Sequence, residues 1–77
     1  MTNMIKQRVI FNIPQEMLLE PIFYTMNRQY DVKIGIIMSD VTAKKALMKL
    51  ELEGEEEQIE KGLAWAMTKG IHVERIK

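Results

Sequence analysis

Apolar residues along this chain recur with two different periods, every second residue in some segments and every three to four residues in others. Alternation at every second residue is typical of strands. Residues 5–13 alternate in character, with Val9, Phe11 and Ile13 on one face, and Pro14 ends the predicted strand because it has no N–H to donate. Residues 32–38 and 46–53 alternate in the same way, so two further strands are predicted there. A last alternation over residues 71–76 predicts a fourth strand.

The inward positions of the two middle strands follow from this alternation. In the second strand we expect one shared face for Ile34, Ile36 and Met38. In the third strand the inward positions are Ala46, Met48, Leu50 and Leu52. We expect Gly54 to end the third strand.

Two segments repeat at the helical period instead. After a short loop over residues 15–20, Pro21 suits the first position of a helix that closes near Tyr30. Its apolar stripe consists of Ile22, Phe23, Met26 and Tyr30. The second helix begins with three glutamates at 55–57, which favour the positive end of the helix dipole, and Gly70 is its expected left-handed end. Its buried stripe consists of Ile59, Leu63, Ala66 and Met67, with Gly62 allowing a close approach to the sheet.

The order of elements is therefore strand, helix, strand, strand, helix, strand. With right-handed crossovers, this order predicts one α+β domain over residues 1–77. The expected architecture is a ferredoxin-like sandwich, in which a four-stranded antiparallel sheet carries both helices on one face.

Composition excludes several classes of function. The chain has no cysteine, so it cannot form a disulfide framework or an iron–sulfur site by itself, and its single histidine has no partners at metal-ligand spacing. Net charge is zero, with seven Lys/Arg against four Asp/Glu in residues 1–50 and four against seven in residues 51–77. No basic stripe is present, and the predicted open sheet face carries no aromatic residue for base stacking. We therefore expect no metal, no cofactor and no nucleic-acid partner.

Membrane insertion and secretion have no support in the sequence. No apolar run approaches the roughly 18 residues that a spanning helix needs. The first nine residues lack the apolar segment of a signal peptide. We expect a cytoplasmic protein that does not insert into a membrane.

Catalytic residues are equally hard to place. His72 precedes Glu74 by two positions on the last strand, where it is either a general base oriented by a carboxylate or an outward-facing edge residue. Ser39 lies in a polar turn. Residues 13–17 contain no glycine for a phosphate-binding loop. We expect no catalytic residue and no enzymatic activity in this chain.

An ordered set of short motifs resembles the NIL domain family. The motifs are Glu20-Pro21-Ile22, Arg28 to Val32, Gly35-Ile36-Ile37, Glu53-Gly54 and Ala64-Trp65. The family is named for an Asn-Ile-Leu run on its second strand, and Gly35 stands at the position of that Asn. The resemblance covers about residues 8–76.

The resemblance implies a regulatory, ACT-like domain. NIL domains occur at the C-terminus of the ATPase of methionine importers, where paired domains bind methionine and inhibit transport. They also occur beside ferredoxin domains and in free-standing forms linked to sulfur amino-acid metabolism. It therefore implies a homodimeric, methionine-sensing module with an ABC transporter or ferredoxin partner. A ligand-free docking module is the alternative, and a subunit of an enzyme whose chemistry lies on another chain is a third.

We expect the ligand at a dimer seam formed by Gly35, Ile36 and Ile37 together with Glu20 and Pro21. Backbone groups there would take the charged ends of an amino acid, and Ile36 or Ile37 would meet its apolar tail. The expected interface residues are Ile10 and Leu47, which with Ile37 form an apolar patch on the open sheet face, and Trp65. Trp65 lies off the buried helical stripe, so it either packs against a partner or lies flat over the flank of its helix.

Overall fold

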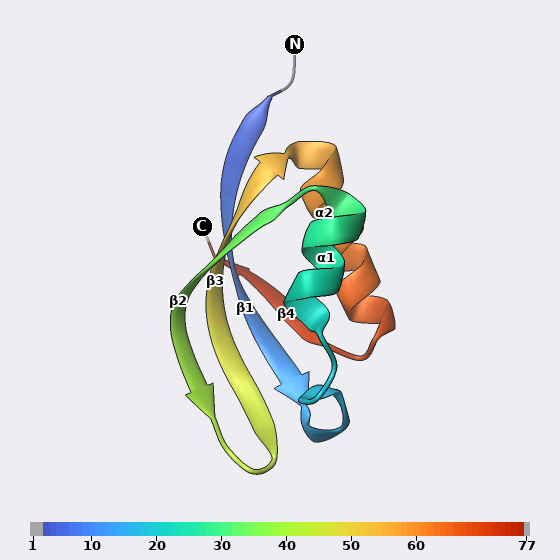
Figure 1. Cartoon of the computed structure of the whole chain (residues 1–77). Coiled ribbons are helices and arrows are strands. Elements are labelled where there is room, and N and C mark those ends of the chain that lie inside the picture. Colours follow the sequence, from blue (N-terminus) through green and yellow to red (C-terminus); the bar gives the residue numbers. More distant parts are fainter. Residues whose placement is uncertain (1–2, 77) are drawn as a thin grey trace.

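Strands and helices alternate along the chain in the predicted order. The computed structural model describes residues 3–76 (Figure 1). The elements are β1 (Met4–Pro14), the short 3-10 helix η1 (Gln15–Met17), α1 (Ile22–Tyr30), β2 (Lys33–Val41), β3 (Lys45–Glu55), α2 (Glu56–Thr68) and β4 (His72–Ile76).

The four strands form one antiparallel sheet in the order β2-β3-β1-β4. β1 and β3 lie in the centre and β2 and β4 form the edges. Both helices cover the same face of the sheet, and the other face is open (Figure 1). The α+β ferredoxin-like fold predicted from the sequence is therefore confirmed.

The core lies between the two helices and the covered face of the sheet. Its buried residues are Val9, Phe11, Ile13, Ile22, Met26, Val32, Ala46, Leu50, Leu52, Ile59, Leu63, Ala66 and Ile71. Phe11 of β1 and Phe23 of α1 pack with ring centroids 6.3 Å apart, which joins the first helix to the sheet. Each large buried side chain stabilises the fold by about 1.5–3 kcal/mol through removal of apolar surface from water.

Gly62 of α2 is buried on the predicted side of the helix, but it faces α1 and not the sheet. A Cβ at this position would lie 3.2 Å from Met26 Cε and 3.8 Å from Tyr30 Cδ2. The expectation that Gly62 brings α2 close to the sheet was wrong. Its missing side chain brings the two helices close to each other.

Met67 is 51% exposed, so its predicted place in the core was wrong. The buried stripe of α2 ends one residue earlier, at Ala66. Gly70 then turns the chain with a φ of 88°, as predicted, and the Ile71 N–H donates to the Ala66 carbonyl at 3.2 Å. This turn puts the buried Ile71 into the core where the next helical residue would have been.

Gly54 does not end β3, contrary to the prediction. It is a buried strand residue that pairs with Ile5 of β1. A Cβ on Gly54 would lie 3.3 Å from the Asp31 carbonyl oxygen and 3.7 Å from the Val32 Cα. The glycine is therefore needed because the chain between α1 and β2 crosses directly over it.

The junction between α1 and β2 is held by a left-handed residue and a side-chain hydrogen bond. Asp31 ends α1 in the left-handed conformation, with a φ of 52°. Asn27 Nδ2 donates to the Val32 carbonyl at 2.9 Å and ties the helix to the start of β2.

β2 is longer than predicted and contains a bulge between Ile36 and Met38. Ile36 pairs with the buried Leu50, but Met38 pairs with Lys49 on the open face. The expectation that Ile34, Ile36 and Met38 share a face was therefore wrong for Met38. One extra residue reverses the alternation of the strand beyond it.

Candidate functional site

An apolar pocket lies beside the end of β2, and we call it the β2-end pocket. Its volume is about 280 Å³. Its walls are Ile13 of β1, Met17, Leu18 and Glu20 of the loop that contains η1, Ile22 and Phe23 of α1, Val41 of β2, and Ala46 and Met48 of β3. A mostly apolar lining with one charged group is typical of small-molecule sites, although the volume is at the lower end of their range.

Glu20 is the only charged residue in this lining. The loop holds it through two backbone bonds, because the Glu20 N–H donates to the Met17 carbonyl at 3.1 Å and the Glu20 carbonyl accepts from the Ile22 N–H at 2.8 Å. Pro21 follows in the N-cap position of α1, one residue before the first helical position that we expected for it, and it makes no capping side-chain hydrogen bond. An exposed carboxylate beside an apolar pocket can accept hydrogen bonds from an ammonium group.

Glu20 and Pro21 also line a second cavity of about 300 Å³, between the start of α1 and the end of α2. Trp65 and Lys69 of α2 form its other side, with the Lys69 ammonium 5.8 Å from the centre of the Trp65 ring. Glu20 therefore borders two neighbouring cavities, and opposite charges lie across the second one.

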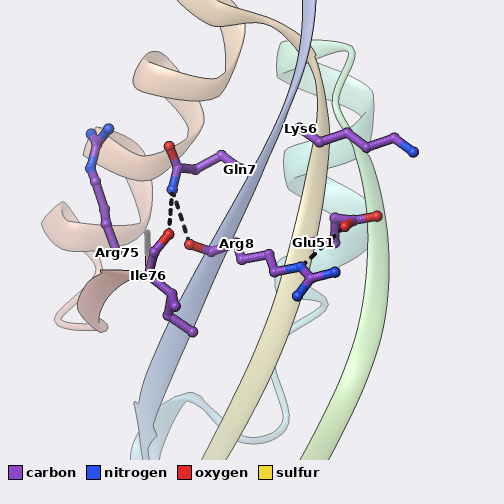
Figure 2. A pocket seen from close by; sticks show the side chains of 6 residues that line it. All are labelled: Lys6, Gln7, Arg8, Glu51, Arg75 and Ile76. Atoms are coloured by element: carbon purple, nitrogen blue, oxygen red, sulfur yellow. Dashed lines mark hydrogen bonds and ion pairs between the residues drawn. The ribbon is translucent and has the colours of Figure 1, made fainter.

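A third cavity, about 580 Å³ and larger than the other two, is a polar notch at the edge of the sheet where β4 ends (Figure 2). Its lining consists of Lys6, Gln7, Arg8, Glu51, Arg75 and Ile76. Arg8 and Lys6 extend over one side of β1, and Arg75 and Gln7 lie on the other (Figure 2). The cations therefore do not converge on one point.

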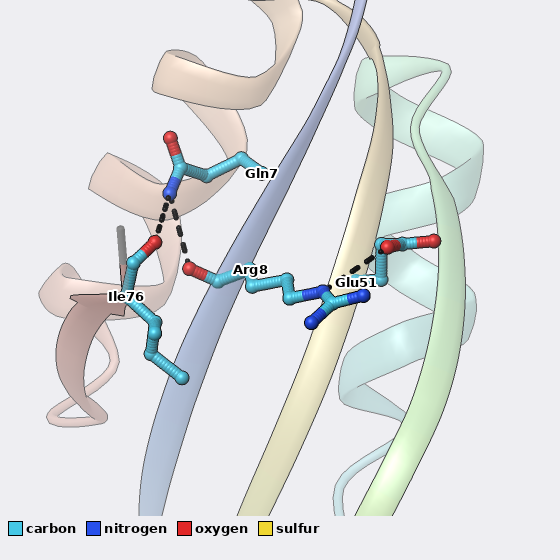
Figure 3. A network of polar contacts seen from close by, with 4 residues as sticks. All are labelled: Gln7, Arg8, Glu51 and Ile76. Carbon is cyan, nitrogen blue, oxygen red and sulfur yellow. Dashed lines mark hydrogen bonds and ion pairs between the residues drawn. The ribbon is translucent and has the colours of Figure 1, made fainter.

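Polar groups of the notch already bind one another (Figure 3). Gln7 Nε2 donates to the Arg8 carbonyl at 3.0 Å and to the Ile76 carbonyl at 3.3 Å, and Arg8 Nε donates to Glu51 Oε2 at 3.3 Å. Since exposed ion pairs contribute at most about 1 kcal/mol, these contacts order the sheet edge rather than form a strong anion site. We therefore take the smaller, apolar β2-end pocket as the candidate site.

Arg75 makes the strongest ion pair described, to Glu60 of α2. Both of its terminal nitrogens donate to the two carboxylate oxygens at 2.6 Å. This bidentate hydrogen bond lowers the pKa of Glu60 and raises the pKa of Arg75, while partial burial opposes both shifts. The pair joins α2 to β4 on the helix side of the sheet.

The predicted ligand residues lie in two places within one copy of the chain. Gly35, Ile36 and Ile37 are exposed on β2, and Ile37 is the extra residue of the bulge. Glu20 lines the same pocket as Val41, and Pro21 is its neighbour in the chain. Val41 is six residues beyond Gly35 along β2, so at the usual strand rise the two groups lie about 20 Å apart. A single copy does not bring the two groups together.

The predicted interface residues are also divided. Ile10 and Leu47 are half-buried on the open face, where Ile10 pairs with Lys49 and Leu47 pairs with Asn12. Trp65 lies on the helix side, half-buried, with its ring 6.5 Å from that of Tyr30. It therefore lies over the flank of its own helix pair, and whether it also contacts a partner stays a prediction.

The polar candidates for catalysis do not form a cluster. His72 and Glu74 are exposed on β4, opposite Asn12 and Ile10 respectively. Ser39 is exposed on β2 opposite Met48, and not in the turn where we expected it. Within residues 3–76, no group of three or more His, Cys, Asp or Glu side chains is placed to hold a metal ion.

Sequence reasoning missed several walls of the β2-end pocket, namely Met17, Leu18 and Val41. The signal was present in part, because the apolar Met17 and Leu18 in a loop need a surface to cover. Leu19, the third apolar residue of the run, is 99% exposed and is not part of the pocket. Met48 was predicted to face inward, and it does so at the pocket wall.

The described helices are short, and the longest has 13 residues. None of the helices in residues 3–76 is long and apolar enough to cross a membrane.

These features define a small ferredoxin-like domain with an apolar pocket of small-ligand size at one end of its sheet. The model of the NIL domain family matches residues 7–75, which is nearly the whole chain. The chain therefore belongs to the NIL domain family.

Seven chains among the solved structures match this chain, and one of them illustrates the shared fold. It is the crystal structure of the C-terminal domain of an ABC transporter ATP-binding protein from Enterococcus faecalis, with a TM-score of 0.82. The sequence identity is 20%, and the alignment covers 91% of this chain and 82% of that chain. None of the curated proteins compared with the chain matches it.

Proposed function

We propose that this chain is a regulatory domain that senses an amino acid of the methionine class and acts on the ATP-binding subunit of an ABC transporter in the cytoplasm. The observation that carries the proposal is the family match over residues 7–75. The fold of an ABC ATP-binding protein's C-terminal domain supports the choice of partner. In this role the chain binds and does no chemistry of its own.

The ligand chemistry follows from the β2-end pocket and the two predicted groups of residues. An unbranched thioether tail suits the apolar walls formed by Phe23, Val41 and Met48. The Glu20 carboxylate takes the ammonium group, and free backbone groups at Gly35 to Ile37 take the carboxylate. The ligand thus needs residues from both groups, which requires a homodimer.

A ligand-free docking module is the second candidate, because exposed apolar residues gather on β2. Ile36, Ile37, Met38 and Val41 are all about half exposed or more. Exposed apolar patches of this kind usually mark sites where another protein binds. In this alternative the transporter subunit or a ferredoxin-type protein covers β2 and no amino acid is involved.

Isothermal titration with methionine, followed by thermal unfolding, separates these candidates. At a free methionine concentration of about ten times Kd, binding adds about 1.4 kcal/mol to the free energy of unfolding. For a domain of this size the midpoint should rise by roughly 6–11 °C. If titration with millimolar methionine released no heat of binding and left the thermal unfolding midpoint unchanged, the sensing function would be overturned and the docking function would remain.

Two loop carboxylates provide a matched test of the ligand contact. Glu20→Gln removes the charge at the pocket and should weaken methionine binding at least about tenfold, as expected for loss of a charge-assisted hydrogen bond. Glu16→Gln changes an exposed carboxylate of the same loop that lines none of the three cavities described, and it should leave binding unchanged. Equal affinities for the two variants would remove Glu20 from the site.

A further inference from the structure

The cavity of about 300 Å³ between the start of α1 and the end of α2 is walled by one face of each helix, and we call it the helix-end cavity (Figure 1). Pro21, Thr25 and Gln29 recur every four residues along α1, and Trp65 and Lys69 are four residues apart at the end of α2. Residues at this spacing lie on one face of a helix. The two faces therefore meet across the cavity.

Polar side chains form much of the lining of the helix-end cavity. Glu20, Thr25, Gln29, Trp65 and Lys69 each carry a charge or a hydrogen-bonding group. The β2-end pocket differs, because Glu20 is the only polar side chain in its lining. The two neighbouring cavities therefore suit different ligands, an apolar tail in the β2-end pocket and a polar molecule in the helix-end cavity.

Two unpaired charges lie on opposite sides of the helix-end cavity. Within residues 3–76, neither Glu20 nor Lys69 forms an ion pair, so the two charged groups are also too far apart to pair with each other. The Lys69 ammonium lies 5.8 Å from the centre of the Trp65 ring. A small zwitterion fits between these charges, because its ammonium group can donate to Glu20 while its carboxylate accepts from Lys69.

The remaining polar groups indicate the side chain of this zwitterion. Gln29 forms no side-chain hydrogen bond within the described part of the chain, so its amide offers both a donor and an acceptor. The Thr25 hydroxyl donates to the Pro21 carbonyl at 2.9 Å, and its oxygen is still able to accept. A carboxamide matches these groups because it donates and accepts, whereas a thioether tail would leave them without partners.

We propose that the helix-end cavity binds a free α-amino acid with a carboxamide side chain, and that this ligand competes with the methionine-class ligand for Glu20. The competition rests on the proposed function, in which Glu20 holds the ammonium group of methionine. Glu20 lines both cavities. Two ammonium groups on one carboxylate repel each other, so the chain holds one ligand at a time. The domain thus responds to the balance between a polar and an apolar amino acid.

Trp65 fluorescence reports the helix-end cavity selectively. Trp65 is the only tryptophan of the chain, and it lines the helix-end cavity and not the β2-end pocket. Titration of the full chain with glutamine should therefore change the emission until it saturates, while methionine should leave the emission unchanged. Norvaline, which lacks the amide, should require a concentration at least about ten times higher, as expected for loss of hydrogen bonds to the ligand.

Two lysines of the same region give a matched pair of variants. Lys69→Gln should weaken glutamine binding at least about tenfold through loss of a charge-assisted hydrogen bond, and it should leave methionine binding unchanged because Lys69 does not line the β2-end pocket. Lys61→Gln changes an exposed lysine of α2 that lines none of the three cavities, and it should alter neither affinity. Calorimetry measures these affinities, since removal of Lys69 also changes the surroundings of Trp65.

Calorimetric titration with methionine in the presence of glutamine tests the shared anchor. At a glutamine concentration of about ten times its own Kd, the apparent Kd for methionine should rise about tenfold. An unchanged methionine affinity in saturating glutamine would show that the ligands do not share Glu20 and would overturn the proposed competition.

The results for the helix-end cavity and for the sensing function remain distinguishable. If millimolar glutamine gives neither an emission change nor heat of binding, or if the two lysine variants bind glutamine equally well, the helix-end site is refuted whatever methionine does. Glutamine binding by a chain that does not bind methionine would refute the sensing function and leave the helix-end site.

Discussion

Gly54 and Gly35 are both strand glycines, and their replacement by alanine should change stability in opposite directions. Neither has a positive φ, so alanine is compatible with the backbone at both positions. The difference lies in what a Cβ would meet. At Gly54 it would lie 3.3 Å from the Asp31 carbonyl oxygen and 3.7 Å from the Val32 Cα, which are backbone atoms that cannot rotate away.

The magnitude follows from two competing effects. Crowding in a packed interior typically costs about 1–3 kcal/mol, while replacing glycine in a strand recovers about 0.5–1 kcal/mol of chain entropy. Gly54→Ala should therefore lower the free energy of unfolding by roughly 0.5–2 kcal/mol. At Gly35 the nearest atom is the Glu51 carbonyl oxygen at 3.8 Å, an ordinary contact, so Gly35→Ala should raise stability by about 0.5–1 kcal/mol.

Urea unfolding followed by Trp65 fluorescence measures both changes, because the half-buried indole packs against Tyr30 in the native state. The two variants should bracket the wild-type midpoint with an unchanged m value. A Gly54→Ala variant at least as stable as Gly35→Ala would refute the account of β3 crossing under the α1–β2 junction.

Two further predictions concern the end of α2 and its link to β4. Gly70→Ala should lower the free energy of unfolding by about 1–2 kcal/mol in urea unfolding, because a φ of 88° is strained for a residue with a Cβ. A Cβ at this position meets no atom within 4 Å, so the loss would come from the backbone alone. A loss near zero would contradict this explanation. Hydrogen bonding from Arg75 lowers the pKa of Glu60 from its ordinary value of 4.5, so the ion pair stabilises the fold above that pH, and the contribution disappears as the pH falls through the lowered pKa. In Glu60→Gln, the free energy of unfolding should therefore fall less between neutral pH and pH values below about 4.5 than in the wild type. The difference should be less than about 1 kcal/mol, since both side chains are nearly half exposed. An unchanged pH profile would show that the pair adds nothing.

The order and type of the elements could be predicted because the hydrophobic period is a local property. Val9, Phe11 and Ile13 alternate as a strand must, and all three are buried. Gly70 was also identifiable, since a helix end followed by a strand needs a left-handed residue. These features depend on neighbours a few positions apart along the chain.

The errors came from contacts between residues far apart in sequence. Gly54 reads as a strand breaker until Asp31 is known to cross it. Gly62 reads as a contact between α2 and the sheet until Met26 of α1 is known to face it. The bulge at Ile37 depends on how β2 pairs with β3, and no property of the Ile36-Ile37-Met38 run announces it. Tertiary packing decided each case against the local pattern.

The candidate site was predictable only in part, for a related reason. Glu20 and Pro21 were named from the family resemblance; Glu20 borders both helix-side cavities, and Pro21 borders only the second one. The apolar walls come from five separate segments, and only the fold brings Met17, Phe23 and Val41 around one space. Their convergence is a property of the topology and not of any motif.

The most direct test of the central claim is a two-dimensional ¹H–¹⁵N NMR titration of the wild-type chain with methionine. The account predicts shifts of the backbone amides of Glu20 and Val41 together with those of Gly35 to Ile37, saturating at one methionine per chain. Shifts confined to the polar notch around Arg8 and Arg75, or no shifts at millimolar methionine, would contradict it.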